Sequence, residues 1–219
     1  KTKYINHVST NFPVEASEPN LHLSNSGNIY LSYISSSPDK KESSLLFSMF
    51  DNLNYSWNKP NLIVKSDKMF VNWADFPELT TDNLNGITAH YLEMSSEKKY
   101  SYDIKIVNST DQGFNWSNPL KLHSDNTKTE HGFVSTINTK NGFLSTYLDG
   151  RQNELSNHDK SIRPQMTLRG TSYNIDGNIL EDLLIDDRVC DCCQTDLAIT
   201  ENGESIVVYR DRSEDEVRD

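Results

Sequence analysis

Cysteine chemistry is concentrated at one point of the chain. Its three cysteines fall in the run Cys190-Asp191-Cys192-Cys193. Thiolates so close together suit a soft metal ion, with copper or zinc as candidates and His131 as a further ligand. The spacing is not that of a paired zinc motif, and no second cysteine cluster completes one. Two alternatives stay open. One is a disulfide, across Cys190 and Cys193 or to a cysteine outside this sequence, and the other is a catalytic thiol.

The arginines are confined to the end of the chain. All seven follow residue 150, whereas thirteen of the fourteen lysines precede it. The planar guanidinium of Arg suits a carboxylate, sulfate or phosphate better than the Lys ammonium does. Most of these arginines are expected to pair with the chain's own acids, because residues 151–219 hold 16 of the 32 carboxylates. Arg151, Arg210 and Arg212 are the candidates for binding an anionic ligand.

Asp75 and Asp149 are the candidates for acid–base chemistry. Asp75 lies in a Trp-Ala-Asp-Phe-Pro run that begins at Trp73, and Asp149 directly precedes a Gly-Arg pair. Carboxyl groups cleave glycosidic bonds in pairs, one as the acid and one as the base or nucleophile. Glu130 and His131 are neighbours, and a lone histidine is more often a structural hydrogen-bonding group than a catalyst. The role of all these residues depends on where the fold places them.

Four copies of one pattern run through the chain. Each is an alternating apolar segment, a turn ending in glycine, and a second segment that reaches a tyrosine. The glycines are 59, 56 and 61 residues apart, and each tyrosine follows its glycine by 5 or 6 residues. Asn-Gly between alternating apolar runs is a strong hairpin signal, because both central residues of the tight turn need positive φ. The repeated positions are Gly27, Gly86, Gly142 and Gly203, with Tyr33, Tyr91, Tyr147 and Tyr209.

A unit of this length that opens with a hairpin predicts an all-β fold, a β-propeller of four-stranded blades. No segment is typical of a long amphipathic helix. Residues 17–74, 75–130 and 131–189 are expected to form three blades, and 190–219 the first two strands of a fourth. Propellers close with roughly four to eight blades. We therefore expect the remaining blades to come from missing sequence or from another chain.

The predicted fold gathers the candidate residues at one end. The first strand of each blade is innermost in a propeller, and adjacent strands are antiparallel. The connections that enter the first strand and leave the second therefore share one face, around the mouth of the central channel. This position makes His131 a functional candidate. The residues expected at the mouth are Trp73, Asp75, Glu130, His131, Asp149, Arg151, Cys190, Cys192, Cys193, Arg210, Asp211 and Arg212.

A turn in the second unit carries a motif with a structural role. Ser109, Asp111, Gly113 and Trp116 form S-x-D-x-G-x-x-W, the Asp-box found in sialidases and related propellers. The Asp is expected to hydrogen-bond the backbone of the turn, and the Trp to pack between strands. The motif indicates the fold and lies at the end opposite the mouth.

Charge and hydropathy exclude two classes of partner. The net charge is −11, the isoelectric point is about 5.0, and no basic stripe with interleaved aromatics occurs. Nucleic acid is therefore not an expected partner. No apolar run approaches the ~18 residues of a membrane span.

Several runs together resemble a group of bacterial exported proteins, the sialidase-family or BNR (Asp-box) repeat proteins. They are residues 70–77, 129–133, 148–151 and 209–213, and Cys-Asp-Cys-Cys-Gln-Thr at 190–195. The resemblance implies a sialidase-like propeller of six blades, exported to the periplasm or cell surface. Sialidases have an Arg-Ile-Pro near the first blade, two further arginines on the sugar carboxylate, a Tyr–Glu nucleophile pair and an Asp acid. No arginine precedes Arg151 here, so the resemblance does not by itself imply sialidase activity.

These observations predict an exported propeller that binds an acidic sugar or a similar anion at its mouth and acts as a glycoside hydrolase. Asp75 or Asp149 would be the acid or base, and the arginines would hold the anion. One alternative is a metal-binding propeller with copper or zinc on Cys190, Cys192, Cys193 and His131. Another is a non-catalytic interaction module.

Overall fold

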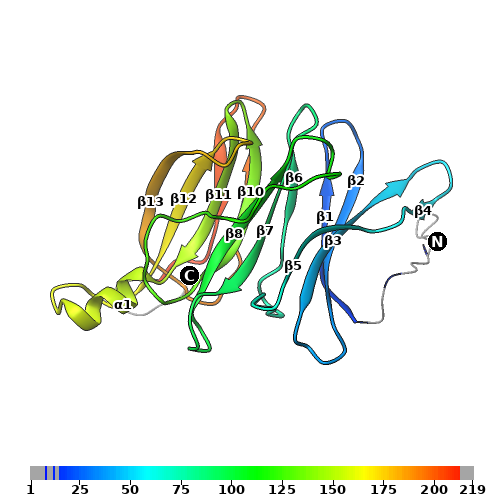
Figure 1. The fold of residues 1–219 in the computed structure, drawn as a ribbon. Coiled ribbons are helices and arrows are strands. Elements are labelled where there is room, and N and C mark those ends of the chain that lie inside the picture. The colour runs from blue at the N-terminus through cyan, green and yellow to red at the C-terminus, as the bar shows by residue number, and fades with distance from the viewer. Residues whose placement is uncertain (1–7, 9–11, 13–14, 213–219) are drawn as a thin grey trace, which may run out of the picture.

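The computed structural model describes residues 8, 12 and 15–212, and every strand pairing in it is antiparallel (Figure 1). Residues 213–219, which the sequence assigns to the fourth blade, lie outside the described part. The fold confirms the predicted propeller of four-stranded blades, with three blades and half of a fourth.

The strands follow the four repeat units in order. The first sheet contains β1 (Ala16–Leu23), β2 (Ile29–Ser36), β3 (Ser43–Asp51), β4 (Ser56–Trp57) and β5 (Asn61–Ser66). The second contains β6 (Leu79–Thr81), β7 (Ile87–Met94), β8 (Tyr102–Ser109) and β9 (Leu120–Lys121). The third contains β10 (His131–Thr139), β11 (Gly142–Asp149), β12 (Met166–Tyr173) and β13 (Ile179–Val189), with the helix α1 (Arg151–His158) between β11 and β12. The last sheet is the hairpin of β14 (Asp196–Ile199) and β15 (Ser205–Val208).

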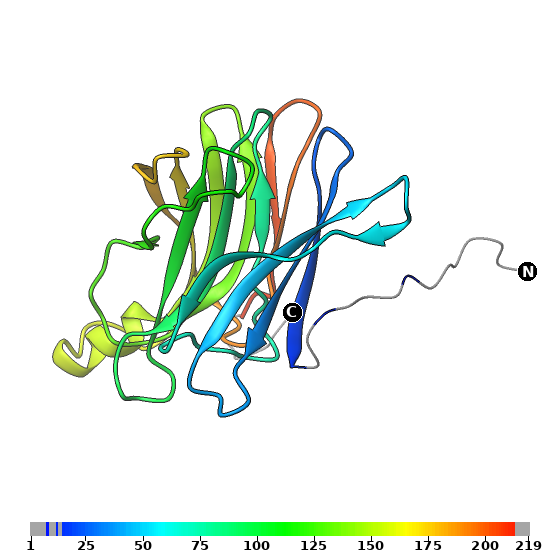
Figure 2. The ribbon, with the colours of Figure 1, turned by 45° about the vertical axis from the view of Figure 1, so that its right-hand side comes forward.

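The sheets stand side by side and bury their apolar residues between them (Figures 1 and 2). The first strands of the units are neighbours in space, since β6 contacts both β1 and β10, and β10 also contacts β14. Each apolar cluster joins two adjacent sheets, as in the pairs Phe47 and Tyr91, Ile104 and Tyr147, and Leu168 and Val207.

The repeated tyrosines have a packing role. Tyr33, Tyr91 and Tyr147 are each no more than 2% exposed. Each lies on the second strand of its sheet and buries a large ring, which removes much apolar area from water. The recurrence of tyrosine in the sequence therefore reflects the core.

Hydrogen bonds between sheets join residues about one repeat apart. His22 Nε2 lies 2.9 Å from Thr81 Oγ1, 59 residues along the chain. The Ser135 hydroxyl donates to the carbonyl oxygen of Thr195 at 2.7 Å, 60 residues along the chain. Equivalent positions of successive blades therefore lie side by side.

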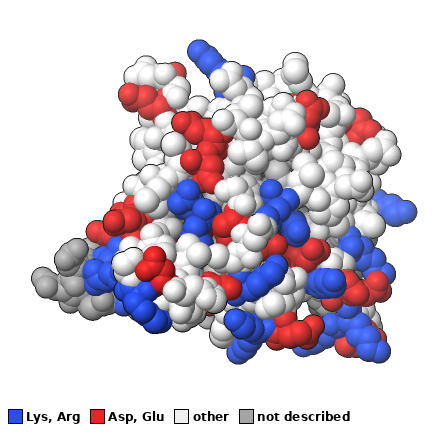
Figure 3. Space-filling view, turned by 60° about the vertical axis from the view of Figure 1, so that its left-hand side comes forward, with Lys and Arg blue, Asp and Glu red and all other residues white. Residues whose placement is uncertain are grey.

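The two ends of the fold differ. The hairpin turns lie at the upper end in Figure 1, and α1 lies at the lower end, with the connections that the sequence places at the mouth. Charged side chains of both signs gather on the lower half of the face seen in Figure 3. Among the described residues, no helix is long and apolar enough to cross a membrane.

Candidate functional site

A small cavity lies where the inner strands of all four units meet. Its volume is about 50 Å³. Its walls are formed by residues of β1, of the segment before β6, of the bulged start of β10 and of the segment before β14. The lining residues are Asn20, Asp75, Phe76, Glu78, Phe133, Val134, Gln194 and Thr195. The predicted mouth residue Asp75 is among them.

Two carboxyl groups of this cavity contact the backbone of the next blade. Asp75 Oδ2 accepts a hydrogen bond from the Phe133 amide at 2.7 Å, and Glu78 Oε2 accepts one from the Thr136 amide at 2.9 Å. Burial raises the pKa of Asp75 to about 7, although the Phe133 amide acts against the shift. Burial also raises the pKa of Glu78 to about 8, and the charges of nearby acids add to it. Both groups are therefore able to carry a proton near neutral pH, which an ordinary surface carboxyl cannot do.

A break in the register of β10 turns the Phe133 amide toward Asp75. Pairing with β11 shifts between Gly132 and Ser135, and Phe133 has a φ of 54°, in the left-handed region. A Cβ at Gly132 would lie 2.2 Å from Asp75 Oδ2. Glycine is thus required here because the carboxyl group occupies the space of a side chain.

Replacing Gly132 with Ala is expected to move the Asp75 carboxyl and leave the Phe133 amide without its acceptor. An unsatisfied buried amide costs about 1–3 kcal/mol of unfolding free energy. Urea denaturation measures the loss. The same substitution in an Asp75→Ala background should have a smaller effect, because the clashing oxygen is gone. Equal losses in the two backgrounds would show that the contact with Asp75 is not the cause.

Trp73 lies at the tip of a tight turn next to the cavity. The Asp75 amide donates to the carbonyl oxygen of Asn72 at 3.2 Å, and the Ala74 amide donates to Asn72 Oδ1 at 3.1 Å. The turn leaves Trp73 83% exposed. An indole exposed in this way offers a flat apolar face to solvent, on the same turn as the cavity residue Asp75.

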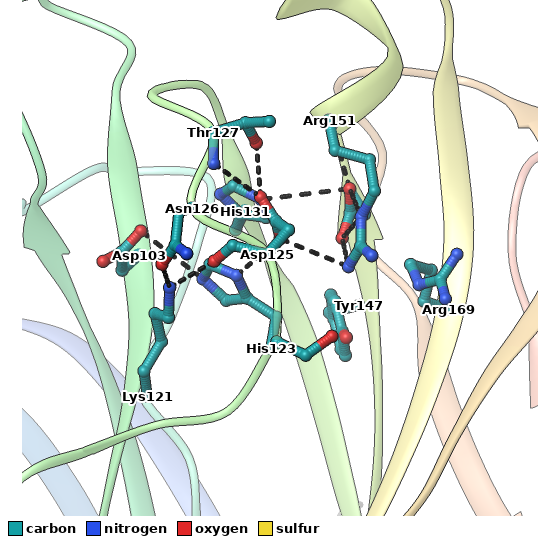
Figure 4. A network of polar contacts seen from close by, with 12 residues as sticks. Asp103, Lys121, His123, Asp125, Asn126, Thr127, His131, Tyr147, Arg151 and Arg169 are labelled. Carbon is teal, nitrogen blue, oxygen red and sulfur yellow. Dashed lines mark hydrogen bonds and ion pairs between the residues drawn. The ribbon is translucent and has the colours of Figure 1, made fainter. Parts of the chain in front are cut away.

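A second group of polar residues is buried between the second and third sheets at the same end (Figure 4). The rings of His123 and His131 stack with centroids 3.8 Å apart and planes 7° apart. Both rings contact one carboxylate oxygen, Asp125 Oδ2, at 2.8 Å and 3.1 Å. Arg151 reaches the same oxygen at 3.3 Å and holds Asp149 with contacts down to 2.6 Å.

The charges of this histidine–carboxylate network stabilise one another. Burial would raise the pKa of Asp125, but hydrogen bonds from His123 and His131 hold it well below its usual range. Burial opposes a charge on His131 as well, yet Asp125 and Asp149 outweigh it and raise the pKa of His131. Burial lowers the pKa of His123. The two histidines share one carboxylate, and the pKa shifts favour a proton on His131 over one on His123.

The network does not suit a metal ion held by both histidines. Asp103, His123 and His131 bring potential ligand atoms within 4.8 Å of one another. The lone pair of an imidazole nitrogen lies in the plane of its ring, so a bound metal ion lies close to that plane. Two parallel rings 3.8 Å apart share no such position. The donor set therefore fits hydrogen bonding between blades.

Three predicted site residues are enclosed by the protein's own polar groups. The Asp149 side chain is 0% exposed and paired with Arg151. The Arg151 guanidinium points at Asp149 and Asp125. His131 is 0% exposed, and its ring nitrogens contact Asp125 and the carbonyl oxygen of Tyr102. These contacts count against a role at the mouth, and that role stays a prediction.

The cysteines form a separate cluster between β13 and β14. Their sulfur atoms all lie within 4.8 Å of one another. Cys190 Sγ is 3.2 Å from Cys193 Sγ and 3.8 Å from Cys192 Sγ, and no disulfide joins them. Arg210 lies beside them, with its Nη1 atom 3.8 Å from Cys193 Sγ. The cysteine cluster thus sits at the predicted mouth without His131.

The remaining predicted residues lie at the same end of the fold. Glu130 is half-buried, and burial together with the charge of Asp191 raises its pKa. Asp211 pairs with Val189 in an isolated bridge, and its Oδ1 atom accepts the Arg212 amide at 2.6 Å. No contact of these residues assigns them a ligand, and their binding role stays a prediction.

The S-x-D-x-G-x-x-W turn is held by its own side chains. Asp111 accepts the Asn115 amide at 2.9 Å, and the Ser109 hydroxyl accepts the Gly113 amide at the same distance. The Trp116 indole donates to the carbonyl oxygen of Gly113 at 3.1 Å and packs edge-on against Phe47 of the first sheet. These contacts are structural.

Sequence reasoning missed four residues of the site. Glu78 follows Asp75 by three positions, just before an inner strand, which is the position that made Asp75 a candidate. Asp125 lies in a Ser-Asp pair that recurs at the end of two units, so its repetition was a usable signal. His123 and Asp103 carry no local signal. These two reach the network only through the packing of two sheets.

Fold and site together define an open β-propeller with a polar cavity at its inner strands, and solved structures support this class. The chain is similar to Penicillium chrysogenum alpha-L-arabinanase complexed with arabinobiose, with a TM-score of 0.60 and 15% identity over 88% of this chain and 58% of that one. It is also similar to an alpha-L-arabinofuranosidase of Fusarium graminearum, with a TM-score of 0.61 and 14% identity over 90% of this chain and 59% of that one. A third similar structure is the NanB sialidase of Streptococcus pneumoniae, with a TM-score of 0.51 and 13% identity over 89% of this chain and 27% of that one.

The similarity concerns the fold, because the identities are low. This chain spans little more than half of the two arabinan-related enzymes and about a quarter of the sialidase. No protein-family model matches the chain, and no curated protein matches it.

Proposed function

We propose that this chain is part of a carbohydrate-active propeller that hydrolyses a glycosidic bond at the inner-strand cavity. The observation that carries the proposal is the pair of cavity-lining carboxyl groups, Asp75 and Glu78, with pKa values raised to about 7 and about 8. Glu78 keeps its proton at neutral pH and serves as the general acid. Asp75 is about half ionised there and serves as the base or nucleophile.

Trp73 supports a sugar as the ligand. Its exposed indole lies two residues before Asp75, at the tip of the turn that positions this aspartate. The apolar face of a sugar ring can stack on such a surface while its hydroxyl groups reach the polar cavity.

We propose further that the sugar is acidic and that its carboxylate is held by arginines. Arg210 and Arg212 lie after β15, and the Cys190 amide donates to the carbonyl oxygen of Arg210 at 2.9 Å, which brings this segment to the connection before β14. Guanidinium groups there would hold a sugar carboxylate. Arg151 is not included among these ligand-binding arginines, because its guanidinium is paired with Asp149.

Replacing Trp73 with Ala is expected to weaken oligosaccharide binding about 30-fold, the equivalent of losing a contact worth about 2 kcal/mol. Isothermal titration with neutral arabinan oligosaccharides and with sialylated oligosaccharides measures it. The sialylated ligands are expected to bind more tightly, and that preference should disappear in an Arg210→Ala/Arg212→Ala variant.

Phe114 offers a matched control for Trp73. It is 85% exposed, on the turn at the opposite end of the fold, so Phe114→Ala removes a similar exposed aromatic side chain without changing binding. Equal losses of oligosaccharide affinity in the two variants would contradict stacking of a sugar ring on Trp73. Binding of neither class of oligosaccharide by the unaltered chain would contradict the proposed function.

We also propose that further blades cover the outer sheets. Leu180, Leu183 and Leu184 on β13 are 45% to 54% exposed, and Ile206 on β15 is 51% exposed. Exposed apolar side chains that recur along a strand at the edge of a sheet are often covered by another surface. The covering blades belong either to this polypeptide or to another chain. The mass of the native assembly distinguishes the two.

A further inference from the structure

The cysteine cluster provides three soft donor atoms at one point. Cys190 is 1% exposed at the end of β13, whereas Cys192 is exposed and Cys193 is half-buried. The cluster is therefore anchored in the core on one side and open to solvent on the other. An ion from solution can reach it without unfolding of the chain.

The distances between the sulfur atoms are close to those expected around a bound metal ion. An ion bound about 2.3 Å from each of three sulfur atoms spreads them roughly 3.8–4.0 Å apart. The distance from Cys190 Sγ to Cys192 Sγ is already 3.8 Å, and that to Cys193 Sγ is 3.2 Å. The third pair, Cys192 and Cys193, also lies within 4.8 Å, so adjustments of about 1 Å or less give a trigonal set of thiolates.

The surroundings compensate the charge that such a set carries. Three thiolates with a monovalent ion have a net negative charge, and the Arg210 guanidinium lies 3.8 Å from Cys193 Sγ. The backbone of the same arginine accepts the Cys190 amide at 2.9 Å. Arg210 is thus positioned by the strand that carries the first thiol.

We propose that Cys190, Cys192 and Cys193 form a binding site for a Cu(I) ion, next to the proposed carbohydrate site. Three S–H protons leave to solvent as three copper–sulfur bonds form, and no electron is transferred. Soft thiolates select Cu(I) or zinc, and structural zinc sites are almost always four-coordinate. Within the described part of the chain, no His, Asp or Glu adds a fourth ligand atom within 4.8 Å of all three sulfur atoms. A set of three thiolates suits Cu(I), and the competition between Cu(I) and Zn(II) described below tests this choice.

The ion would stiffen the loop that lines the carbohydrate cavity. Gln194 follows the last cysteine directly, and its Nε2 atom donates to the carbonyl oxygen of Ala74 at 2.9 Å. Thr195 donates its hydroxyl to the carbonyl oxygen of Phe133 at 2.9 Å. Cu(I) binding therefore fixes the segment before β14 against the turn of Asp75.

The full chain, reduced and metal-free, is titrated with Cu(I) under nitrogen in competition with a chromophoric chelator. The proposal expects about one tightly bound equivalent, with X-ray absorption showing only sulfur neighbours. It also expects uptake to disappear in the Cys192→Ser/Cys193→Ser variant, and thermal unfolding of the loaded chain to shift upward. A Glu201→Gln variant, altered at the exposed β14–β15 turn, should bind like the unaltered chain.

Three results would overturn the assignment. The first is equal copper uptake by the double Ser variant, which would mean adventitious binding. The second is a disulfide across Cys190 and Cys193 in the protein as isolated, detected by mass spectrometry after alkylation of the remaining thiol. The third is a chain that takes up Zn(II) in preference to Cu(I). Circular dichroism of the double variant establishes that it is folded.

Discussion

Replacing Asp125 with Asn is expected to lower the free energy of unfolding by about 3 kcal/mol, because removing one partner of a buried charge network leaves the others uncompensated. For a chain of this size the loss corresponds to a fall of roughly 6–12 °C in melting temperature. Asp125 is 12% exposed and shares one oxygen among His123, His131 and Arg151. Calorimetry at pH 6 measures the effect.

The pH dependence separates this network from a general packing defect. The raised pKa of His131 means that its charged form adds stability that is fully present below pH ~6.5 and is lost as the pH rises through the folded-state pKa. The loss caused by Asp125→Asn should therefore be smaller at pH 9 than at pH 6. Asp39→Asn is the control, since Asp39 is 56% exposed beside Lys41 and such pairs contribute about 0–1 kcal/mol. If both variants melt alike, Asp125 has no such role.

Under the proposed function, replacing Asp75 with Asn and Glu78 with Gln is expected to lower kcat for oligosaccharide hydrolysis by about 10²–10⁴-fold for each carboxyl group. The amide side chains keep the shape and can still accept the Phe133 and Thr136 amides, so the loss reports the missing proton or charge. Rates of sugar release by each single variant measure it. Glu42→Gln, at an exposed ion pair with Lys65, is the control.

The same two variants are expected to be more stable than the unaltered chain at alkaline pH. Both carboxyl groups have raised pKa values, so they make the native chain lose stability as the pH rises from about 4 to about 7 for Asp75 and to about 8 for Glu78. The variant that carries both substitutions should not lose stability over this pH range. Unchanged hydrolysis together with a flattened slope would mean that the carboxyl groups are buried structural acceptors only.

The fold was predictable because each blade repeats a local pattern. An alternating strand, a glycine turn and a buried tyrosine recur, and each is a statement about a few neighbouring residues. The site was less predictable. Asp75 was expected at the mouth, and it lines the cavity because it precedes an inner strand, whereas Glu78 in the same segment escaped notice.

Asp149 and Arg151 mark the limit of sequence reasoning. Both lie at the predicted end of the fold, but a position at that end does not tell whether a side chain faces the channel or the neighbouring blade. They face Asp125, which comes from the sheet before them. The stacking of His123 on His131 likewise joins residues from two sheets, and no local pattern in the chain encodes it.

The sequence by itself predicted the all-β class, the order of the repeat units in this chain and the end at which the polar residues gather, because hairpin periodicity and strand direction are local properties. Only the tertiary structure decided which of those residues are neutralised inside the protein and which line a cavity. That decision depends on how neighbouring sheets pack, since burial sets the charge of Asp75 and Glu78 and the Asp125 carboxylate sets that of His131.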